Sequence, residues 1–485
     1  MIRAIPFLLC LLVSASIQGQ APATDVAYTL YFVGDAGEPE IVNQPLGRVL
    51  RRQAEQSGPN TTLFYLGDNI YPKGMPPADA RSRAASELTL KTQAGWIQGL
   101  GVRGIFIPGN HDWQRGKKNG QSMLMNQQQF IDSLNDKYIT MLPRDGCPGP
   151  VEIPLPGNAV LVILDTQWFL HPWDKPSGDE SPCDVKNGAE AWVAINDIFA
   201  RNAGKRVIVA AHHPLITHGE HGGVFTWKDH LFPLTAVKQN LYIPLPVIGS
   251  IYPLYRKWFG DVQDTSHPLY KEVSTLIQNI MLQYPGSVYA AGHEHALQYL
   301  VRDSLHMIGS GSGSKTTFVK KKKYSRYAGS VQGFVKLSIK NDGSAVTEYW
   351  QVDDTFPEGK EVYRDVLPAL QRLKPLTAAE EISFKDKVVK IEGSKQYAAG
   401  KRHEALLGAN YRAAWTQPIE VPVFDIGTEQ GGLKAVQKGG GMQTLSLRLQ
   451  DSTGREFVLR SVEKYPENAV PEMLRKTFAQ DLVQD

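Results

Sequence analysis

Short apolar runs alternate with polar segments that contain glycine over about residues 26–350. The runs are rich in β-branched and aromatic residues, which predicts buried strands. Seven runs have this pattern: VAYTLYFVGD, TTLFYLGD, GIFIPGNHD, AVLVILDTQW, KRVIVAAHH, GSVYAAGHEH and LHMIGSGSG. Between them, apolar residues recur at helical spacing in NQPLGRVLRRQAEQ and AEAWVAINDIFARN. This alternation predicts an α/β fold in which helices cover sheets.

The pattern changes toward the end of the chain. GFVKLSIKNDGSAVTEYWQV predicts a hairpin that turns at Asn341-Asp342-Gly343. The sequence then becomes charged and helix-like, and strand-like runs around a glycine loop and a hairpin follow. We therefore expect three parts: a domain over 22–352, a helical linker over 353–409, and a C-terminal α+β unit over 410–485 whose fold and completeness stay open.

The chain begins with a segment typical of export. Arg3 precedes an apolar run of about a dozen residues, and small and polar residues follow. This layout predicts a signal peptide over residues 1–20 and a secreted, periplasmic or cell-envelope protein. The apolar run is too short to favour a membrane span. The net charge of +3 is too small to indicate a nucleic-acid partner.

Two cysteines lie beyond this leader, and both are in loops rich in proline and glycine. Cys147 lies in DGCPGP and Cys183 lies in SPCDVK. In an exported protein such a pair is more often bonded than free. We therefore predict a disulfide between them, which would contribute roughly 3 to 4 kcal/mol through the loop that it closes.

Two inserts leave alternatives open. Residues 230–268 contain LYIPLPVIGSIYPLYRKWFG, in which proline and glycine interrupt an apolar, aromatic stretch and exclude a continuous membrane helix. The insert is either an extended loop packed on the domain, or a lid or loop that contacts a membrane surface. VKKKKYSR, over Val319–Arg326, is either a solvated loop or a rim that attracts phosphate.

Five of the predicted strands end in polar clusters of similar chemistry. They are Asp35 in VGDAG, Asp68 and Tyr71 in GDNIY, Asn110-His111-Asp112 in PGNHD, His212-His213 in VAAHHP, and His293 and His295 in AGHEH. The carboxyl ends of strands in an open α/β sheet converge on one crevice. Carboxylate, amide and imidazole groups bind hard to borderline metals, and this set is too large for one ion. We therefore predict two metal ions with Asp68 as the bridging ligand.

Taken in order, the motifs GDAG, GDNIY, GNHD, VAAH and GHEH resemble the metallophosphoesterase (calcineurin-like) superfamily. Within it, they are most similar to the purple acid phosphatases of the small tartrate-resistant type, over roughly residues 26–350. The resemblance implies two mixed β-sheets flanked by helices, ferric iron at the first metal site, and divalent iron, zinc or manganese at the second. It implies Asp35, Asp68, Tyr71 and His295 as ligands of the first metal, and Asp68, Asn110, His212 and His293 as ligands of the second.

The resemblance also assigns residues near the substrate. His111 would face the phosphate, and His221 in HHPLITHGEHG would help the leaving group depart, with the neighbouring His218 as a rival. The small acid phosphatases follow GNHD with another histidine, whereas this chain has Trp113, which would add an aromatic wall. Tyr71 marks the purple branch, because a phenol binds as phenolate only where a strongly charged cation such as ferric iron removes its proton.

Three functions are consistent with these observations. The leading hypothesis is an exported dinuclear phosphatase that hydrolyses phosphomonoesters, in small molecules or phosphoproteins, by in-line attack of metal-bound hydroxide. The same site also suits a phosphodiesterase or a nucleotide pyrophosphatase. The alternative from another class is a cell-envelope binding or assembly protein, in which the phosphoesterase unit serves the C-terminal unit.

Overall fold

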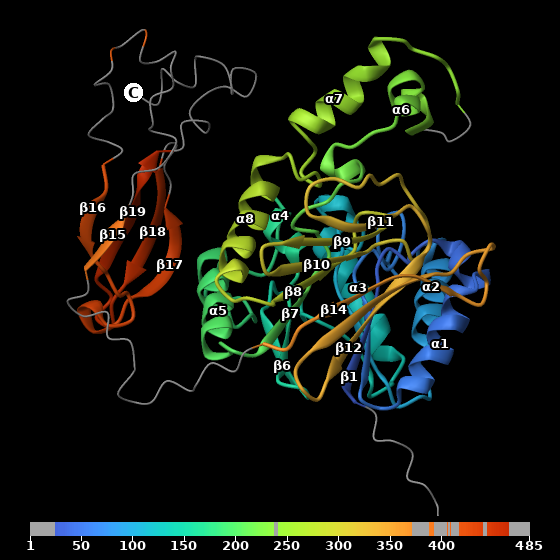
Figure 1. Cartoon of the computed structure of the whole chain (residues 1–485), viewed down its shortest axis with the longest axis horizontal. Helices are drawn as coiled ribbons and strands as arrows, with labels where there is room; N and C mark the ends of the chain where they lie inside the picture. Colours follow the sequence, from blue (N-terminus) through green and yellow to red (C-terminus); the bar gives the residue numbers. More distant parts are fainter. Residues whose placement is uncertain are drawn as a thin grey trace, which may run out of the picture.

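The computed structural model describes residues 25–236, 241–370, 388–391, 417–439 and 444–464, and the single residues Ala405 and Gly408. Two seven-stranded sheets pack face to face, and helices cover both outer faces (Figure 1). This confirms the two mixed sheets flanked by helices that the sequence predicts. The expected signal peptide over 1–20 and the chain beyond residue 464 lie outside the described residues.

The first sheet has the strand order β14-β13-β12-β1-β2-β3-β4. Its strands β1 to β4 are parallel, whereas β12 to β14 form antiparallel hairpins beside β1. The bounds are β1 Val26–Val33, β2 Thr61–Tyr65, β3 Arg103–Phe106, β4 Ile139–Met141, β12 Gly333–Lys340, β13 Ala345–Gln351 and β14 Lys360–Leu367. The predicted turn at residues 341–343 connects β12 to β13, so this hairpin is confirmed.

The second sheet has the order β11-β9-β10-β8-β7-β6-β5. Here β6, β7, β8 and β10 are parallel, and β5, β9 and β11 pair antiparallel to their neighbours. The bounds are β5 Val151–Leu155, β6 Ala159–Ile163, β7 Arg206–Ala210, β8 Val288–Ala291, β9 Leu297–Arg302, β10 Leu305–Ser310 and β11 Ser325–Gly329. All seven runs that the sequence predicts as strands are strands.

The helices form the two outer layers. α1 Leu46–Ser57, α2 Arg83–Gly95 and α3 Gly120–Ser133 pack on the first sheet, and α4 Thr166–Leu170, α5 Gly188–Arg201 and α8 Pro268–Leu282 pack on the second. Successive side chains of a strand point to opposite faces of its sheet. Each sheet can therefore pack against helices on one face and against the other sheet on the other face. In β1, Tyr31 and Val33 pack under the helices, while Leu30 and Phe32 pack between the sheets.

The first domain extends past the expected boundary at residue 352, and the segment expected to be a helical linker begins with a strand. β14 pairs with β13 and extends the first sheet, so residues 360–367 are strand and belong to the first unit. β14 is the edge strand and leaves Lys360, Arg364 and Val366 exposed, so it can carry charges that a central strand would exclude. The Arg206 guanidinium joins the end of this strand to the second sheet, because it donates to Pro368 O at 2.6 Å and to Gly286 O at 2.8 Å.

Two small sheets follow. β15 Val388–Ile391 pairs with β16 Ile419–Pro422, and β17 Lys434–Gly439, β18 Thr444–Gln450 and β19 Glu456–Lys464 form an antiparallel sheet, in which β18 and β19 are the hairpin predicted from the sequence. The three-stranded sheet lies beside α5 (Figure 1). Leu433, Ala435 and Leu449 form a small buried cluster with Ala189 of α5, and Asn187 Nδ2 donates to Val436 O at 2.7 Å.

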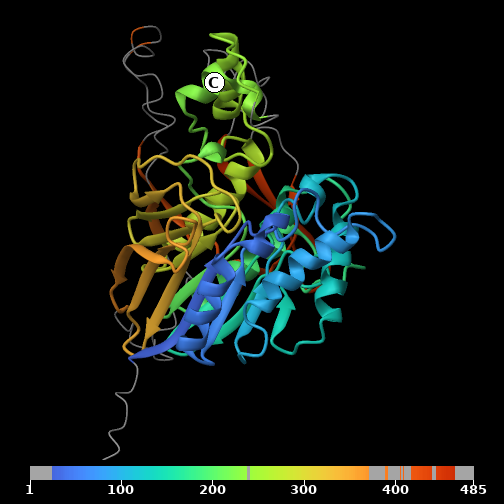
Figure 2. The same ribbon diagram turned by 90° about the vertical axis from the view of Figure 1, so that its right-hand side faces the viewer.

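The insert over 230–268 contains short helices, whereas its described residues 241–247 and 259–267 are not helical. α6 Trp227–Leu231 and α7 Ile251–Trp258 project beyond both sheets, as the two views show (Figures 1 and 2). The expectation of an extended loop packed on the domain is therefore wrong for α6 and α7, whereas residues 260–267 form a non-helical segment in which Gln263 and Asp264 are buried. Among the described residues, every helix is too short or too polar to cross a membrane.

The structure contains the predicted disulfide. Cys147 and Cys183 have Cα atoms 5.5 Å apart and close a loop across 36 positions of the chain. This loop includes β5, β6 and α4, and Cys183 is buried. A cross-link of this span removes much of the conformational freedom of the unfolded chain.

We predict that the double variant C147A/C183A lowers the free energy of unfolding by about 3 to 4 kcal/mol, because the loop is no longer closed in the unfolded chain. Urea denaturation without reductant measures the change. Wild type in the presence of reductant is the control and should unfold with the variant. Unchanged stability in both samples would contradict the prediction.

Candidate dinuclear metal site

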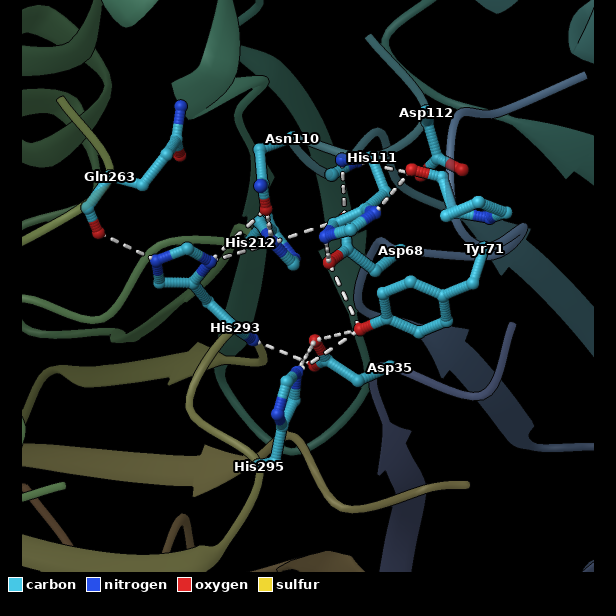
Figure 3. Close-up of polar contacts among 12 residues, drawn as sticks. Asp35, Asp68, Tyr71, Asn110, His111, Asp112, His212, Gln263, His293 and His295 are labelled. Carbon is cyan, nitrogen blue, oxygen red and sulfur yellow. Dashed lines mark hydrogen bonds and ion pairs between the residues drawn. The ribbon is translucent and has the colours of Figure 1, made fainter. Parts of the chain in front are cut away.

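The polar residues predicted from the sequence lie together at the ends of strands from both sheets (Figure 3). Asp35, Asp68 and Asn110 follow β1, β2 and β3 of the first sheet. His212 and His293 follow β7 and β8 of the second sheet. The parallel strands of each sheet direct their carboxyl ends to this edge, so residues far apart in the chain meet here.

The backbone at this edge is strained and closely packed. Asp35, Asp68 and His293 have φ angles of 57°, 54° and 68°, which side-chain-bearing residues rarely adopt. Gly67 lies so close to the His212 ring that a Cβ at this position would be 2.5 Å from Nδ1. Strain and close approach of this kind gather at functional sites.

One half of the site surrounds the hydroxyl of Tyr71. This oxygen lies 2.9 Å from Asp35 Oδ1, 3.1 Å from Asp68 Oδ2 and 3.1 Å from His295 Nε2. His295 Nε2 is also 3.4 Å from Asp35 Oδ1. The four side chains are those that the resemblance assigns to the first metal. Since a phenol has one proton, it cannot donate to all of these neighbours at once.

The other half of the site gathers around Asn110. Its Oδ1 lies 2.9 Å from His212 Nε2 and 3.2 Å from His293 Nδ1, and these two nitrogens are 3.2 Å apart. His212 Nε2 is 3.5 Å from Asp68 Oδ1. Asp68 therefore directs one oxygen toward each half of the site. These are the residues that the resemblance assigns to the second metal.

Two backbone carbonyls set the tautomers of the histidines in this half. His212 Nδ1 lies 2.7 Å from Leu66 O, and His293 Nε2 lies 2.8 Å from Gln263 O. A carbonyl only accepts, so these nitrogens carry the protons and the opposite nitrogens present lone pairs. Two imidazole lone pairs and an amide oxygen thus face one another without a proton between the rings. A cation among them removes this repulsion, so the donor set fits a metal ion.

The charge states of Asp68, His212 and His293 also suit cations. Burial raises the pKa of Asp68, but the imidazoles of His111 and His212 outweigh it and hold that pKa below its ordinary value, which keeps the carboxylate ionised. Burial and the neighbouring Asp68 raise the pKa of Asp35 well above its usual range, so a cation beside this carboxyl would be needed to keep it ionised. Burial lowers the pKa values of His212 and His293, so both rings are neutral at pH 7. Neutral imidazole and ionised carboxylate are the forms that bind metals.

His213 lies beside these ligands and has a different role. A ligand atom of His213 is within 4.8 Å of ligand atoms of His212 and His293. However, its Nδ1 lies 2.8 Å from Thr166 Oγ1 and its Nε2 lies 2.8 Å from Gln263 Oε1. Both nitrogens are engaged, so we interpret His213 as a support for its neighbours and not as a ligand.

Two side chains of the GNHD motif, His111 and Asp112, have different roles. His111 Nδ1 lies 2.7 Å from Pro72 O, and its Nε2 lies 3.8 Å from Asp68 Oδ2, which places the ring beside the ligand cluster. Asp112 instead accepts from the backbone N of Gly109 at 2.8 Å and from the Asn69 side chain at 3.0 Å. Asp112 therefore holds the loop in shape, and His111 is free to meet a substrate.

The two candidate proton donors lie in different places. The centroid of the His221 ring is 4.0 Å from that of His293, next to the ligand cluster. His221 Nδ1 lies 3.0 Å from Asp264 Oδ1, and burial lowers its pKa while Asp264 and Glu294 raise it by more, so its pKa is above the ordinary value. His218 instead has Nε2 2.7 Å from Lys323 O. The geometry favours His221 over His218.

Trp113 does not form the aromatic wall that its position after GNHD suggests. Its side chain is fully buried in the core of the first sheet, and its Nε1 donates to Asp165 Oδ2 at 2.8 Å. Burial raises the pKa of Asp165 to about 7 despite this hydrogen bond. Trp113 therefore packs in the core beneath the GNHD loop and does not line the substrate side of the site.

Several neighbours of the site were not predicted from the sequence. Asp264 lies in the insert, and Glu294 between the two histidines of GHEH accepts from Thr217 Oγ1 at 2.9 Å and from His221 N at 3.1 Å. Lys315 lies over the Tyr71 ring, with Nζ 3.4 Å from its centroid. A charged residue inside a metal motif, such as Glu294, is the one local clue that a search for supporting residues could have used.

Three solved structures resemble this chain at low identity. GAP50, the anchor in the inner membrane complex of Plasmodium, has 14% identity and a TM-score of 0.44, covering 71% of this chain and 90% of that one. The purple acid phosphatase PPD1 of yellow lupin has 13% identity and a TM-score of 0.44, covering 71% of this chain and 54% of that one. A Vps29 mutant from Entamoeba histolytica has 10% identity and a TM-score of 0.26, covering 70% of this chain and 99% of that one.

No curated protein matches the chain in sequence. The chain spans about half the length of the lupin enzyme, and likenesses this distant carry no information on activity. A family model does match, and it describes the calcineurin-like phosphoesterases. The match covers residues 29–297, which include more than half of the chain and all the strand-end residues of the site. The chain belongs to the calcineurin-like phosphoesterase family of metal-dependent hydrolases, which bind two metal ions.

Proposed function

We propose that the protein is an exported phosphatase that hydrolyses phosphomonoesters with two metal ions. One observation carries the proposal: two buried groups of ligand atoms share Asp68, and one of them includes the hydroxyl of Tyr71. The first group would hold ferric iron, because a phenol binds well only to a cation that removes its proton. The second, with an amide and two imidazoles, suits divalent iron, zinc or manganese.

The bound cations would neutralise the negative charge of the phosphate and acidify a water molecule near it. The chain's own residues orient the substrate and move the proton. His111 would face the phosphate, since its ring lies beside the ligand cluster with Nε2 3.8 Å from Asp68 Oδ2. His221 would protonate the departing oxygen, and Asp264 holds its Nδ1 so that Nε2 is presented to the substrate.

Export is supported by two independent features. The first residues have the layout of a signal peptide, and the Cys147–Cys183 disulfide is typical of proteins that fold in an oxidising compartment. Substrates in this proposal are therefore phosphate esters outside the cytoplasm, in small molecules or phosphoproteins. Diesters and nucleotide pyrophosphates remain the competing substrates for the same site.

The first prediction tests the reaction and the bridging role of Asp68. Purified wild type should contain two metal ions per chain and should hydrolyse an aryl phosphomonoester faster than the matching diester. D68A should lose both metals and all measurable hydrolysis, since each cation loses a ligand and the charge between them. D132A, which removes a surface carboxylate, is the control. Faster diester turnover would overturn the choice of substrate, and full metal content in D68A would overturn the dinuclear site.

The second prediction concerns His221. H221A should slow the hydrolysis of alkyl phosphates by about 10²- to 10⁴-fold, because a general acid matters most when the departing oxygen is basic. Activated aryl esters should be affected far less. The control is H218A, which should change neither rate much because His218 bonds to Lys323 O away from the ligand cluster. Equal losses on both classes of ester in H221A would assign the proton transfer to another group.

The third prediction concerns Tyr71. Iron-loaded wild type should absorb visible light through charge transfer from the phenolate, and Y71F should lose this band and bind the first metal more weakly. Some hydrolysis should remain in Y71F, because the phenol holds the cation and does not attack phosphorus. The measurement is the visible spectrum at matched iron content, with Y65F as a control that removes another buried hydroxyl. A colourless, fully active wild type with two zinc or manganese ions would contradict the iron assignment.

A further inference from the structure

α7 exposes an apolar face of the kind that helices in soluble proteins bury. Ile251, Tyr255 and Trp258 are spaced i, i+4 and i+7, so they lie along one side of the helix. Their side chains are 65%, 52% and 55% exposed, whereas Pro253 is buried and Arg256 turns toward the body of the protein. In α7 the apolar side chains therefore face solvent, whereas a helix of a soluble protein usually packs them against the core.

The apolar surface continues beyond this helix. We call α6 together with residues 241–259 the arm, and it projects beyond both sheets (Figure 2). Trp227, Tyr242 and Val247 are among its exposed side chains. Nine of the 22 large apolar side chains that are exposed in the described part of the chain lie in the arm. Single exposed apolar residues are ordinary, but a cluster of this size marks an interaction surface.

Positive charge borders the arm. Residues 241–259 contain two basic residues and no acidic one, and residues 315–326 contain six basic residues and no acidic one. The loop Lys320–Lys323 contacts the segment that leads into α6, since Lys320 N donates to His218 O at 3.0 Å and His218 Nε2 lies 2.7 Å from Lys323 O. Partial burial and the ammonium groups of Lys257 and Lys320 lower the pKa of Lys322. An apolar, aromatic surface with this border is complementary to a negatively charged partner with an apolar interior.

We propose that the arm and the Lys320–Lys323 loop form a docking surface for a lipid bilayer that carries anionic headgroups. Tryptophan and tyrosine favour the interface between headgroups and acyl chains, and Ile251 and Val247 suit the apolar layer below it. Each lysine near an anionic bilayer adds about 1 kcal/mol of attraction. The proposal does not depend on which phosphate ester the site hydrolyses.

The base of the arm is connected to the candidate metal site. Arg256 Nε donates to Asp264 Oδ2 at 2.9 Å, and Asp264 in turn holds His221. Gly223, two residues after His221, packs so closely on α7 that a Cβ there would lie 2.8 Å from the Cα of Lys257. The docking surface therefore adjoins the side of the site that carries His221.

Co-sedimentation of the full chain with lipid vesicles tests the proposal. Wild type should bind vesicles of phosphatidylcholine with phosphatidylglycerol and should bind pure phosphatidylcholine much less. The triple variant I251S/Y255S/W258S should lower binding to the anionic vesicles by at least about tenfold. Replacing Lys320–Lys323 with glutamine should remove the preference for anionic lipid and the dependence on salt.

Matched controls separate docking from misfolding and self-association. W173S changes a similarly exposed tryptophan outside the arm and should bind like wild type. The triple variant should hydrolyse a soluble aryl ester at the wild-type rate, which shows that it is folded. Failure of wild type to bind either vesicle, or equal binding by the triple variant, would overturn the proposal. So would a wild-type dimer in analytical ultracentrifugation that becomes a monomer in the triple variant, because the arm would then bind a second copy.

Discussion

Repulsion among buried ligand atoms is the constraint on which the rest of the site depends. Asp68 is almost inaccessible to solvent, and it presents one oxygen to the group around Tyr71 and the other to the group around Asn110. Carboxylate oxygens and imidazole lone pairs at these distances repel one another in a low-dielectric interior. The protein holds them there with backbone hydrogen bonds and strained φ angles, and bound cations turn this repulsion into attraction.

The two-sheet architecture makes this crowding possible. Each sheet contributes ligands from the carboxyl ends of its own parallel strands, and the two rows of strand ends face each other across the core. Ligands on a single sheet edge would lie side by side at the spacing between strands. Facing edges instead allow Asp68 of the first sheet and His212 of the second sheet to approach within 3.5 Å.

Much of this architecture could be predicted from the sequence because it depends on local patterns. Alternating apolar runs identify strands, and a polar residue after each run identifies the site. Asp264 and Arg256 could not be predicted, since their roles depend on where the insert folds back beside His221. Trp113 was misjudged because its partner, Asp165, is 52 positions away. β14 was mistaken for helix-like sequence because an edge strand keeps charges that a central strand would exclude.

The position of β14 has a consequence for how the two units can be separated. It covers the edge of β13, and Pro368 just after it accepts from Arg206 of the second sheet. A chain shortened at residue 352 would expose an unpaired strand edge and leave the buried guanidinium short of an acceptor. Such a fragment would be prone to pair with its own copies. A fragment that ends after Pro368 instead of at the end of β13 would keep both the strand pair and the acceptor of Arg206.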